Sequence, residues 1–284
     1  MTTIDFITEL FCRIDDEMKE VPKHPQSYLY PSEIVTLGAL FALKGGGSRA
    51  FYRWVERDYR PLFHTLPERT RLFRLFEVHW DWTIRFLVEP SLLSVIDSYG
   101  IELIHPVREG RSDAQIGRKG LSNRRWIIGG KLCWLLNHLG LVVGWNFATA
   151  NVHDTYFQPM IEHFADRTVI FSDLGFHAKE GDPDNLKVCK PYTHNERMLV
   201  ETALSLLTTI CHFKKVFHRT WEQFQARLAF TMAIYNLLIS WNGFTADPPL
   251  VIFPLAAPAI ALIGIALFDR RVVDWNRDGT RKSF

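Results

Sequence analysis

The sequence predicts an α/β protein in which an all-helical N-terminal unit precedes a mixed sheet flanked by helices. In residues 1–90, apolar side chains recur at helical spacing between breaks formed by proline and glycine. After Pro90 the pattern changes to short apolar runs of strand length. Farther along, such a run alternates with helical segments, which is typical of a sheet covered by helices.

The N-terminal unit, residues 1–90, is expected to contain four helices. The first is amphipathic, and the proline-punctuated segment 21–31 separates it from the second. Three consecutive glycines, Gly45 to Gly47, end the second helix, and Ser48 can cap the third. These helices are expected over residues 4–20, 33–43, 48–60 and 67–88.

The second unit, residues 91–245, is expected to contain the sheet and its covering helices. A third segment, residues 246–284, is an apolar and then polar C-terminal extension whose role the sequence does not define. Strands are expected over 93–97, 101–105, 130–136, 141–149 and 168–172, and helices over 155–165, 195–217 and 221–241.

The composition of the 284 residues is that of a globular protein. Hydrophobic residues make up 47% and charged residues 23%, which excludes a disordered chain. The four cysteines are widely spaced and form no CxxC pair, so neither a zinc knuckle nor a disulfide framework is indicated, and a reducing cytoplasm fits best. The N-terminus lacks the basic start and apolar core of a signal peptide.

The net charge of +2 does not by itself indicate a nucleic-acid partner, but the charge is unevenly distributed. Three segments each carry seven basic residues against two or three acidic ones: 49–74, 108–131 and 187–227. Basic segments that are far apart in sequence can meet on one face after folding and bind a polyanion. The alternative is an ordinary solvated surface.

Residues 248–268 form a charge-free run of 21 residues, which is long enough to span a bilayer. Four prolines cluster in its first half and leave only about ten residues of uninterrupted helix, which argues against a membrane anchor. The alternatives are a packed C-terminal extension and an altered reading of the end of the gene, and both stay open.

Three carboxylates stand out by their positions. Asp97 and Asp173 each close a short apolar run, and Glu201 lies among basic and hydroxyl side chains on one stripe of the helix 195–217. Singly, such residues are commonly turn residues, helix caps or solvated groups. Together they repel one another and need a cation, and oxygen ligands favour Mg²⁺ or Mn²⁺. Two such ions about 4 Å apart support phosphodiester cleavage.

Around these residues the sequence resembles the DDE transposases of bacterial insertion sequences, over roughly residues 28–240. The resemblance implies a ribonuclease-H-like catalytic fold, metal-dependent cleavage at transposon ends and strand transfer into target DNA. It is carried by VIDS around Asp97, FSDLGFH around Asp173, ERMLVETALSLLT around Glu201, and the segments PSEIVTLGALFALKGGGSRAFYRWV, REGRSDAQIGRKG and ARLAFTMAIYNLLI.

The resemblance implies that Asp97, Asp173 and Glu201 are the catalytic, metal-binding carboxylates. Asp97 would bridge two ions, and the other two would each hold one. The gap of 28 residues between Asp173 and Glu201 excludes the large inserted domain of some relatives. Arg197 falls on the motif arginine, whereas Thr208 stands where some branches have a lysine.

Other residues are candidates for supporting roles. His153 and Asp154 follow a strand and are candidates for support behind the carboxylates. The tryptophans, among them Trp80, Trp82, Trp126, Trp134 and Trp145, are expected mostly in the core. Candidate DNA contacts are Arg197, Lys214, Lys215, Arg49, Arg53, Arg57, Arg118 and Lys119.

The leading functional hypothesis is a DNA transposase that uses two Mg²⁺ ions and no small-molecule cofactor. Its expected partners are terminal inverted repeats, bound by the N-terminal unit, and target DNA, with a homo-oligomer on paired ends. Its expected location is the cytoplasm, on the nucleoid when bound to DNA. The alternatives are a catalytically inactive DNA-binding relic, which the unusual tail motivates, and a membrane-attached protein, which rests on residues 248–268 alone.

Overall fold

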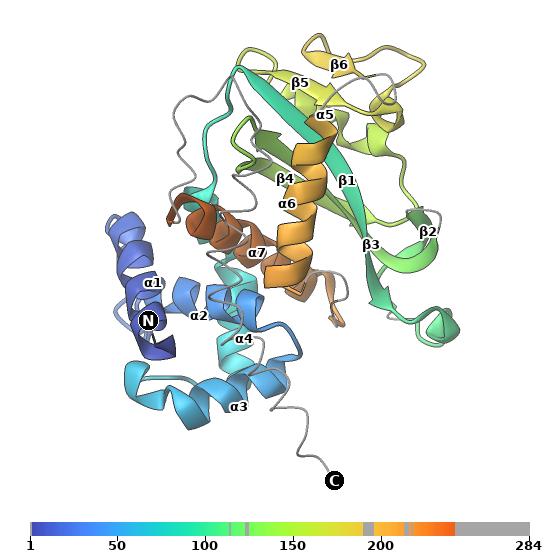
Figure 1. The fold of residues 1–284 in the computed structure, drawn as a ribbon. Coiled ribbons are helices and arrows are strands. Elements are labelled where there is room, and N and C mark those ends of the chain that lie inside the picture. Colours follow the sequence, from blue (N-terminus) through green and yellow to red (C-terminus); the bar gives the residue numbers. More distant parts are fainter. Residues whose placement is uncertain are drawn as a thin grey trace.

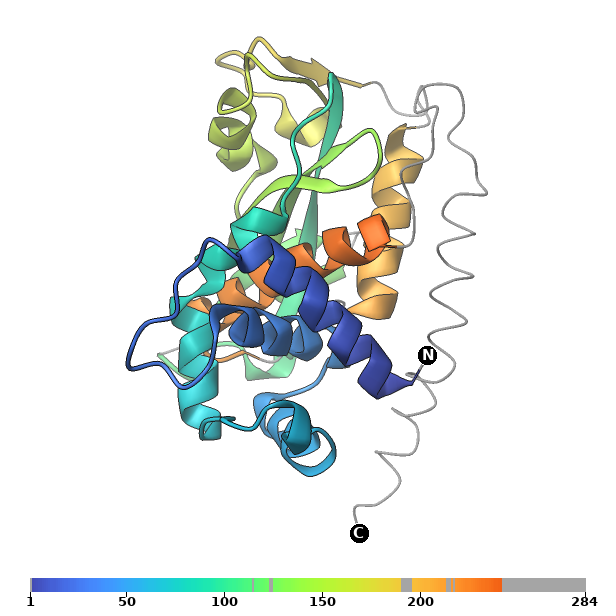
Figure 2. The same ribbon diagram turned by 90° about the vertical axis from the view of Figure 1, so that its left-hand side faces the viewer.

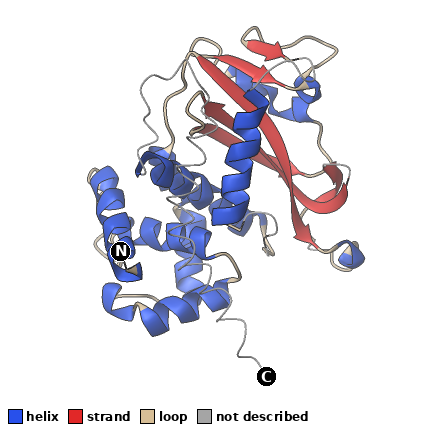
Figure 3. Ribbon diagram, in the orientation of Figure 1, coloured by secondary structure: helices blue, strands red, loops and turns tan. Residues whose placement is uncertain are grey.

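The computed structural model describes residues 2–113, 115–122, 125–189, 196–212, 216 and 218–241. The chain is an α/β protein with a mixed sheet flanked by helices, as the sequence predicts (Figures 1 and 3). The first helices gather at one end of the sheet (Figure 2).

The N-terminal helices follow their sequence signals closely. They are α1 (Thr3–Met18), α2 (Pro31–Lys44), α3 (Ser48–Asp58) and α4 (Arg69–Val78). The side chain of Thr2 caps α1, and the Glu33 carboxylate accepts the Tyr30 amide at 2.7 Å at the start of α2. Gly45 ends α2 with φ +62°, a conformation that favours glycine.

Several expected helices are shorter than predicted. The helix expected over 67–88 stops at Val78, and a 3₁₀ segment, η2 (Trp80–Phe86), follows it. The helix expected over 155–165 is a 3₁₀ turn, η4 (Asp154–Phe157), and one short helix, α5 (Gln158–Glu162). Pro159 at the start of α5 fits a helix beginning there rather than one already running.

The sheet has six strands in the order β2-β3-β1-β5-β6, with β4 also paired to β3. β1 pairs with β3 in antiparallel fashion and with β5 in parallel fashion, which makes the sheet mixed. β3 is long enough for β2 and β4 to share one of its edges in succession. The strands are β1 (Leu93–Ile104), β2 (Arg118–Ser122), β3 (Arg125–Asn137), β4 (Val142–Thr149), β5 (Val169–Ser172) and β6 (Leu186–Val188).

The two strands expected over 93–97 and 101–105 are one continuous strand. Gly100 lies within β1 and does not interrupt it. The absence of a side chain at this position leaves room for β2. A Cβ on Gly100 would lie 2.6 Å from the Ser122 hydroxyl of β2. β2 and β6 were not predicted: β2 is short and largely polar, and β6 has only three residues.

Two long helices complete the fold, α6 (Glu196–Ile210) and α7 (Trp221–Trp241). The helix expected over 195–217 therefore ends at Ile210. α7 and α6 contribute to one continuous core with the N-terminal helices and one face of β1 and β3. A smaller core lies against the opposite face, where α5 and β5 contribute. The larger core extends across residue 90, the expected boundary of the N-terminal unit.

α7 is tied to its surroundings by buried polar side chains. The side-chain oxygen of Asn236 accepts a hydrogen bond from the backbone amide of Val142 at 2.7 Å. Its side-chain nitrogen donates to the backbone carbonyls of Phe86 at 2.9 Å and Val142 at 2.7 Å. The Tyr235 hydroxyl donates to the Gly140 carbonyl at 2.9 Å. The Ala–Ile–Tyr–Asn run at residues 233–236 thus joins α7 to β4 and η2.

Arg227 of α7 is only 2% exposed and has no carboxylate partner among the described residues. Its guanidinium donates to the carbonyls of Phe41, Ala42 (2.9 Å) and Cys211 (3.0 Å), and it stacks on the Phe41 ring. These carbonyls belong to the last turn of α2 and the end of α6, where helix dipoles are negative. Burial lowers the pKa of Arg227 to about 10.

No helix in the described ranges combines the length and the apolar character needed to cross a membrane. The apolar run 248–268 lies outside the described residues.

Replacing Arg227 by methionine should lower the free energy of unfolding by about 3 kcal/mol, because three buried carbonyls lose a charged donor. The denaturant midpoint should fall while the m-value stays unchanged. Lys19→Met, which removes a cation from an exposed pair with Asp16, is the control and should change the midpoint little. A methionine variant as stable as the parent would show that these bonds contribute nothing net.

Candidate active site

Asp97 lies within β1, not at the end of a strand as the sequence suggested. Its direct partner on the neighbouring strand β3 is Trp134. Its neighbours on the same face, Val95 and Tyr99, pack against the large core, which also holds the apolar residues of α6. Asp97 therefore lies on the sheet face that α6 covers, and α6 contacts β1 directly (Figure 1).

Asp173 follows β5 directly and begins a 3₁₀ turn, η5 (Leu174–Phe176). β1 and β5 are adjacent and parallel, with Val95 opposite Phe171. Two residues farther along each strand, the same register reaches Asp97 and Asp173. Both aspartates therefore lie just beyond the end of the parallel pairing, Asp97 within β1 and Asp173 at the turn that follows β5.

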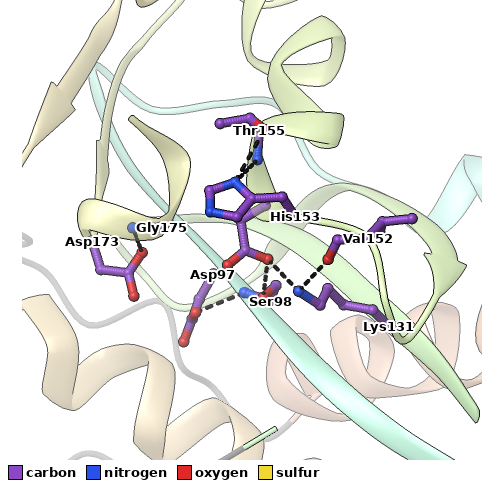
Figure 4. Close-up of polar contacts among 9 residues, drawn as sticks. Asp97, Ser98, Lys131, Val152, His153, Thr155, Asp173 and Gly175 are labelled. Carbon is purple, nitrogen blue, oxygen red and sulfur yellow. Dashed lines mark hydrogen bonds and ion pairs between the residues drawn. The ribbon is translucent and has the colours of Figure 1, made fainter. Parts of the chain in front are cut away.

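The turn after Asp173 fixes the direction of its carboxylate. Oδ1 of Asp173 accepts the Gly175 amide at 2.9 Å (Figure 4). A Cβ on Gly175 would lie 3.0 Å from this oxygen and 2.7 Å from Oδ2 of Asp154. Gly175 is thus needed for room, and the carboxylates of Asp154 and Asp173 both approach the same point.

Asp154 is held by two donors from two strands. Its Oδ1 accepts the Ser98 hydroxyl of β1 at 2.6 Å and the Lys131 ammonium of β3 at 2.9 Å (Figure 4). Lys131 also donates to the Val152 carbonyl at 2.8 Å. The side chains of Lys131 and Asp154 are 12% and 20% exposed, so this ion pair is largely shielded from water.

His153 bonds within its own turn. Its ring nitrogen Nδ1 lies 3.1 Å from the Thr155 hydroxyl and accepts the Thr155 amide, which makes His153 the cap of η4 (Figure 4). Of the two residues expected to support the carboxylates, Asp154 therefore lies beside them and His153 shapes the turn that carries Asp154.

Burial raises the pKa of the Cys133 thiol well above its ordinary value, and the negative charges of Asp97 and Asp154 raise it further. Cys133 is directly opposite Ser98 and is fully buried. The two aspartates thus flank one buried position of β3 from opposite faces of the sheet. The thiol there stays protonated and unreactive.

Glu201 is exposed on α6, the helix that packs against β1. Its helix also carries Arg197, but the side chain of Arg197 lies outside the described residues, as do Lys214 and Lys215. The carboxylate oxygens of the three expected ligands are donors that suit Mg²⁺. Within the described ranges, however, no three His, Cys, Asp or Glu side chains converge closely enough to hold a metal ion.

The other candidate DNA contacts lie on two separate elements. Arg49, Arg53 and Arg57 are exposed along one stripe of α3, where Arg57 also forms a paired hydrogen bond with Asp58. On β2, Arg118 and Lys119 are both exposed, and Lys119 lies 3.9 Å from Glu109. The sequence-based expectation for the tryptophans holds for Trp134, which is 1% exposed, but Trp126 is 59% exposed.

Three residues of the site, Ser98, Lys131 and Gly175, were not predicted from the sequence. A usable signal existed for Lys131, because it is a lone charge within the apolar run IIGGKLCWLL. Ser98 and Gly175 carried no such signal, since their roles depend on contacts across the sheet and across a turn.

Comparisons with family models, with curated proteins and with solved structures find no match for this chain.

The Lys131–Asp154 pair should show a thermodynamic coupling of about 1 to 2 kcal/mol in a double-mutant cycle of Lys131→Met and Asp154→Asn. Each single change leaves its partner without its main contact in a shielded place, so the double variant should lose less stability than the sum of the two. Denaturant midpoints measure this. The exposed Lys19–Asp16 pair is the matched control and should show no measurable coupling. Additive losses at Lys131 and Asp154 would contradict the interpretation.

Proposed function

We propose that this chain is a DNA transposase of the DDE type with a ribonuclease-H-like catalytic core. One observation supports the proposal: β1 and β5 are adjacent and parallel, Asp97 and Asp173 each lie two residues beyond their last parallel pair, and α6, which bears Glu201, contacts β1. This order of two strand aspartates and one helical glutamate is the pattern on which the sequence resemblance rests.

Asp97, Asp173 and Glu201 would hold two Mg²⁺ ions, with Mn²⁺ as a substitute. When bound, such ions activate a water or hydroxyl nucleophile and stabilise the leaving oxygen of a phosphodiester. The chain's own contribution is to fix the ligands. Gly175 donates its amide to Asp173, and Lys131 offsets the charge of the neighbouring Asp154.

The proposal assigns recognition of terminal inverted repeats to the N-terminal helices, residues 1–90. The exposed stripe of Arg49, Arg53 and Arg57 supports it, since arginines at a spacing of four can follow a phosphate backbone. Because these helices share a core with α7, the proposal assigns DNA recognition to them as part of the whole chain rather than as a separate unit. A homo-oligomer on paired ends and a cytoplasmic location belong to the same proposal.

The second candidate is a catalytically inactive, DNA-binding transposase relic. The charge-free run at 248–268 favours it, because a tail with four prolines and no charge has no role in the expected chemistry. The two candidates differ in one respect: the relic binds DNA without metal and never cuts it.

Asp97→Asn, Asp173→Asn and Glu201→Gln should each abolish metal-dependent cleavage of DNA carrying the gene's own flanks. Each removes a ligand charge while keeping its shape, so DNA binding should persist. Gel analysis of the products with Mg²⁺ or Mn²⁺ measures cleavage, and gel shift measures binding. Asp166→Asn, an exposed carboxylate elsewhere, is the control and should cut like the parent. If Asp173→Asn cuts as well as the parent, the site assignment is wrong; if the parent binds and never cuts, the relic is the better account.

Replacing both Arg49 and Arg53 by alanine should weaken DNA binding and flatten its salt dependence. The slope of log K against log salt should decrease in magnitude by about 0.9 for each phosphate contact removed. Titrations at several salt concentrations measure it. Arg13→Ala on α1 is the control, since α1 is acidic overall and is not expected to touch DNA. An unchanged slope in the double variant would remove α3 from the interface.

A further inference from the structure

The β2–β3 hairpin exposes an unusual apolar pair at the edge of the sheet. Leu121 and Trp126 are 56% and 59% exposed, and they are direct partners across the two strands. Direct partners point to the same side of a hairpin, so the two side chains form one patch. The Lys119 ammonium lies 5.5 Å from the centre of the Trp126 ring, in the range of a cation–π contact.

The surroundings of this pair are strongly basic. Residues 105–126 contain six arginines and lysines against two acidic residues. On the hairpin itself Lys119 is exposed on the same face as Leu121 and Trp126, and Arg118 and Arg125 are exposed on the opposite face, where Arg125 lies 3.6 Å from the mostly covered Glu102. The aromatic ring therefore has one cation beside it and two behind it on the same hairpin.

An exposed aromatic and apolar pair on a hairpin with several cations suits a nucleic-acid partner better than a protein partner. The centres of protein interfaces are depleted of charged residues, whereas surfaces that bind DNA bases combine aromatic rings with arginine and lysine. A second copy of this chain that added a strand to β2 would have to approach its exposed cations, and charges on an edge strand oppose such pairing. Charge complementarity therefore favours a polyanion that also presents flat apolar faces.

The hairpin has a defined position relative to the candidate active site. Trp126 and Trp134 are eight residues apart on β3, so they share one face of the sheet, and Trp134 is the partner of Asp97. At about 3.4 Å per residue the separation is about 27 Å. This matches about eight base pairs of duplex DNA.

We propose that Trp126 and Leu121 contact DNA bases, with Trp126 stacking on a base that distortion of the helix exposes, while Lys119 on the same face and Arg118 and Arg125 on the opposite face of the hairpin hold phosphates on either side. Apolar side chains at such positions open base steps, and stacking on an aromatic ring compensates for the lost stacking. The inference rests on the proposed transposase function and adds a base contact about eight base pairs from the cleaved bond.

The test compares Trp126→Ala and Trp126→Phe in the full-length chain, with duplex DNA carrying the gene's own flanks. The alanine variant should bind about tenfold more weakly at every salt concentration with an unchanged salt slope, because stacking releases no counterions. The phenylalanine variant should retain most of the affinity. Arg118→Ala should instead reduce the salt slope, and Ile4→Ala, an exposed apolar residue on α1, should bind like the parent.

A second measurement does not depend on the folding of any variant. Duplexes with single 5-iododeoxyuridine substitutions at successive positions are irradiated with the parent protein, and cross-linked peptides are identified by mass spectrometry. Cross-links to the peptide containing Trp126, about eight base pairs from the cleavage site, support the proposal. A parent that cuts DNA, with equal binding by Trp126→Ala and no cross-link at this peptide, overturns the proposal alone. A parent that binds no DNA overturns the proposed function as well, and a change of oligomeric state in Trp126→Ala would assign the patch to a contact between copies.

Discussion

The Arg227 guanidinium connects three helices, α2, α6 and α7, through hydrogen bonds to backbone carbonyls. α2 comes from the N-terminal unit and α6 and α7 follow the sheet, yet the last carbonyls of α2 and the end of α6 converge on one side chain of α7. A buried cation is costly without a counter-charge, and here the negative ends of two helices take the place of a carboxylate. The end of α6, the helix that bears Glu201, is thereby tied to α2 and α7.

The candidate site depends equally on strand register. Because β1 and β5 are parallel and adjacent, a shift of one residue would turn either aspartate toward the opposite face. Next to this register, Asp154 connects β1 to β3, because its Oδ1 accepts hydrogen bonds from Ser98 of β1 and Lys131 of β3, and its Oδ2 lies close to Gly175 in the turn after β5. One carboxylate thus lies against two strands and the turn that follows a third.

Much of the architecture could be predicted from the sequence, because helical periodicity, proline and glycine breaks and apolar runs are local signals. Helices α1, α2, α3 and α7 were predicted close to their observed bounds, and the position of β5 was almost right. The errors arose where tertiary contacts decide. Gly100 looked like a strand end and is a glycine required by the approach of β2, and Trp126 looked like a core residue and lies on the exposed part of a hairpin. For the site, the choice of Asp97 and Asp173 came from local pattern, whereas the roles of Lys131 and Ser98 depend on pairing between distant strands.

β2 and β4 pair with different stretches of β3, so the two ends of this strand have different backbone partners. Around Trp134 the strand has partners on both sides, β1 and β4, but pairing with β1 ends at Ile128 and the tip beyond it is a ribbon of two strands. Two-stranded ribbons twist more strongly than wide sheets and have little stability of their own. The same strand therefore holds Asp97 between paired strands and presents Trp126 where β2 is the backbone partner among the described residues, and the side chains of Ser122 and Arg125 are what still connect this end to Gly100 and Glu102 of β1.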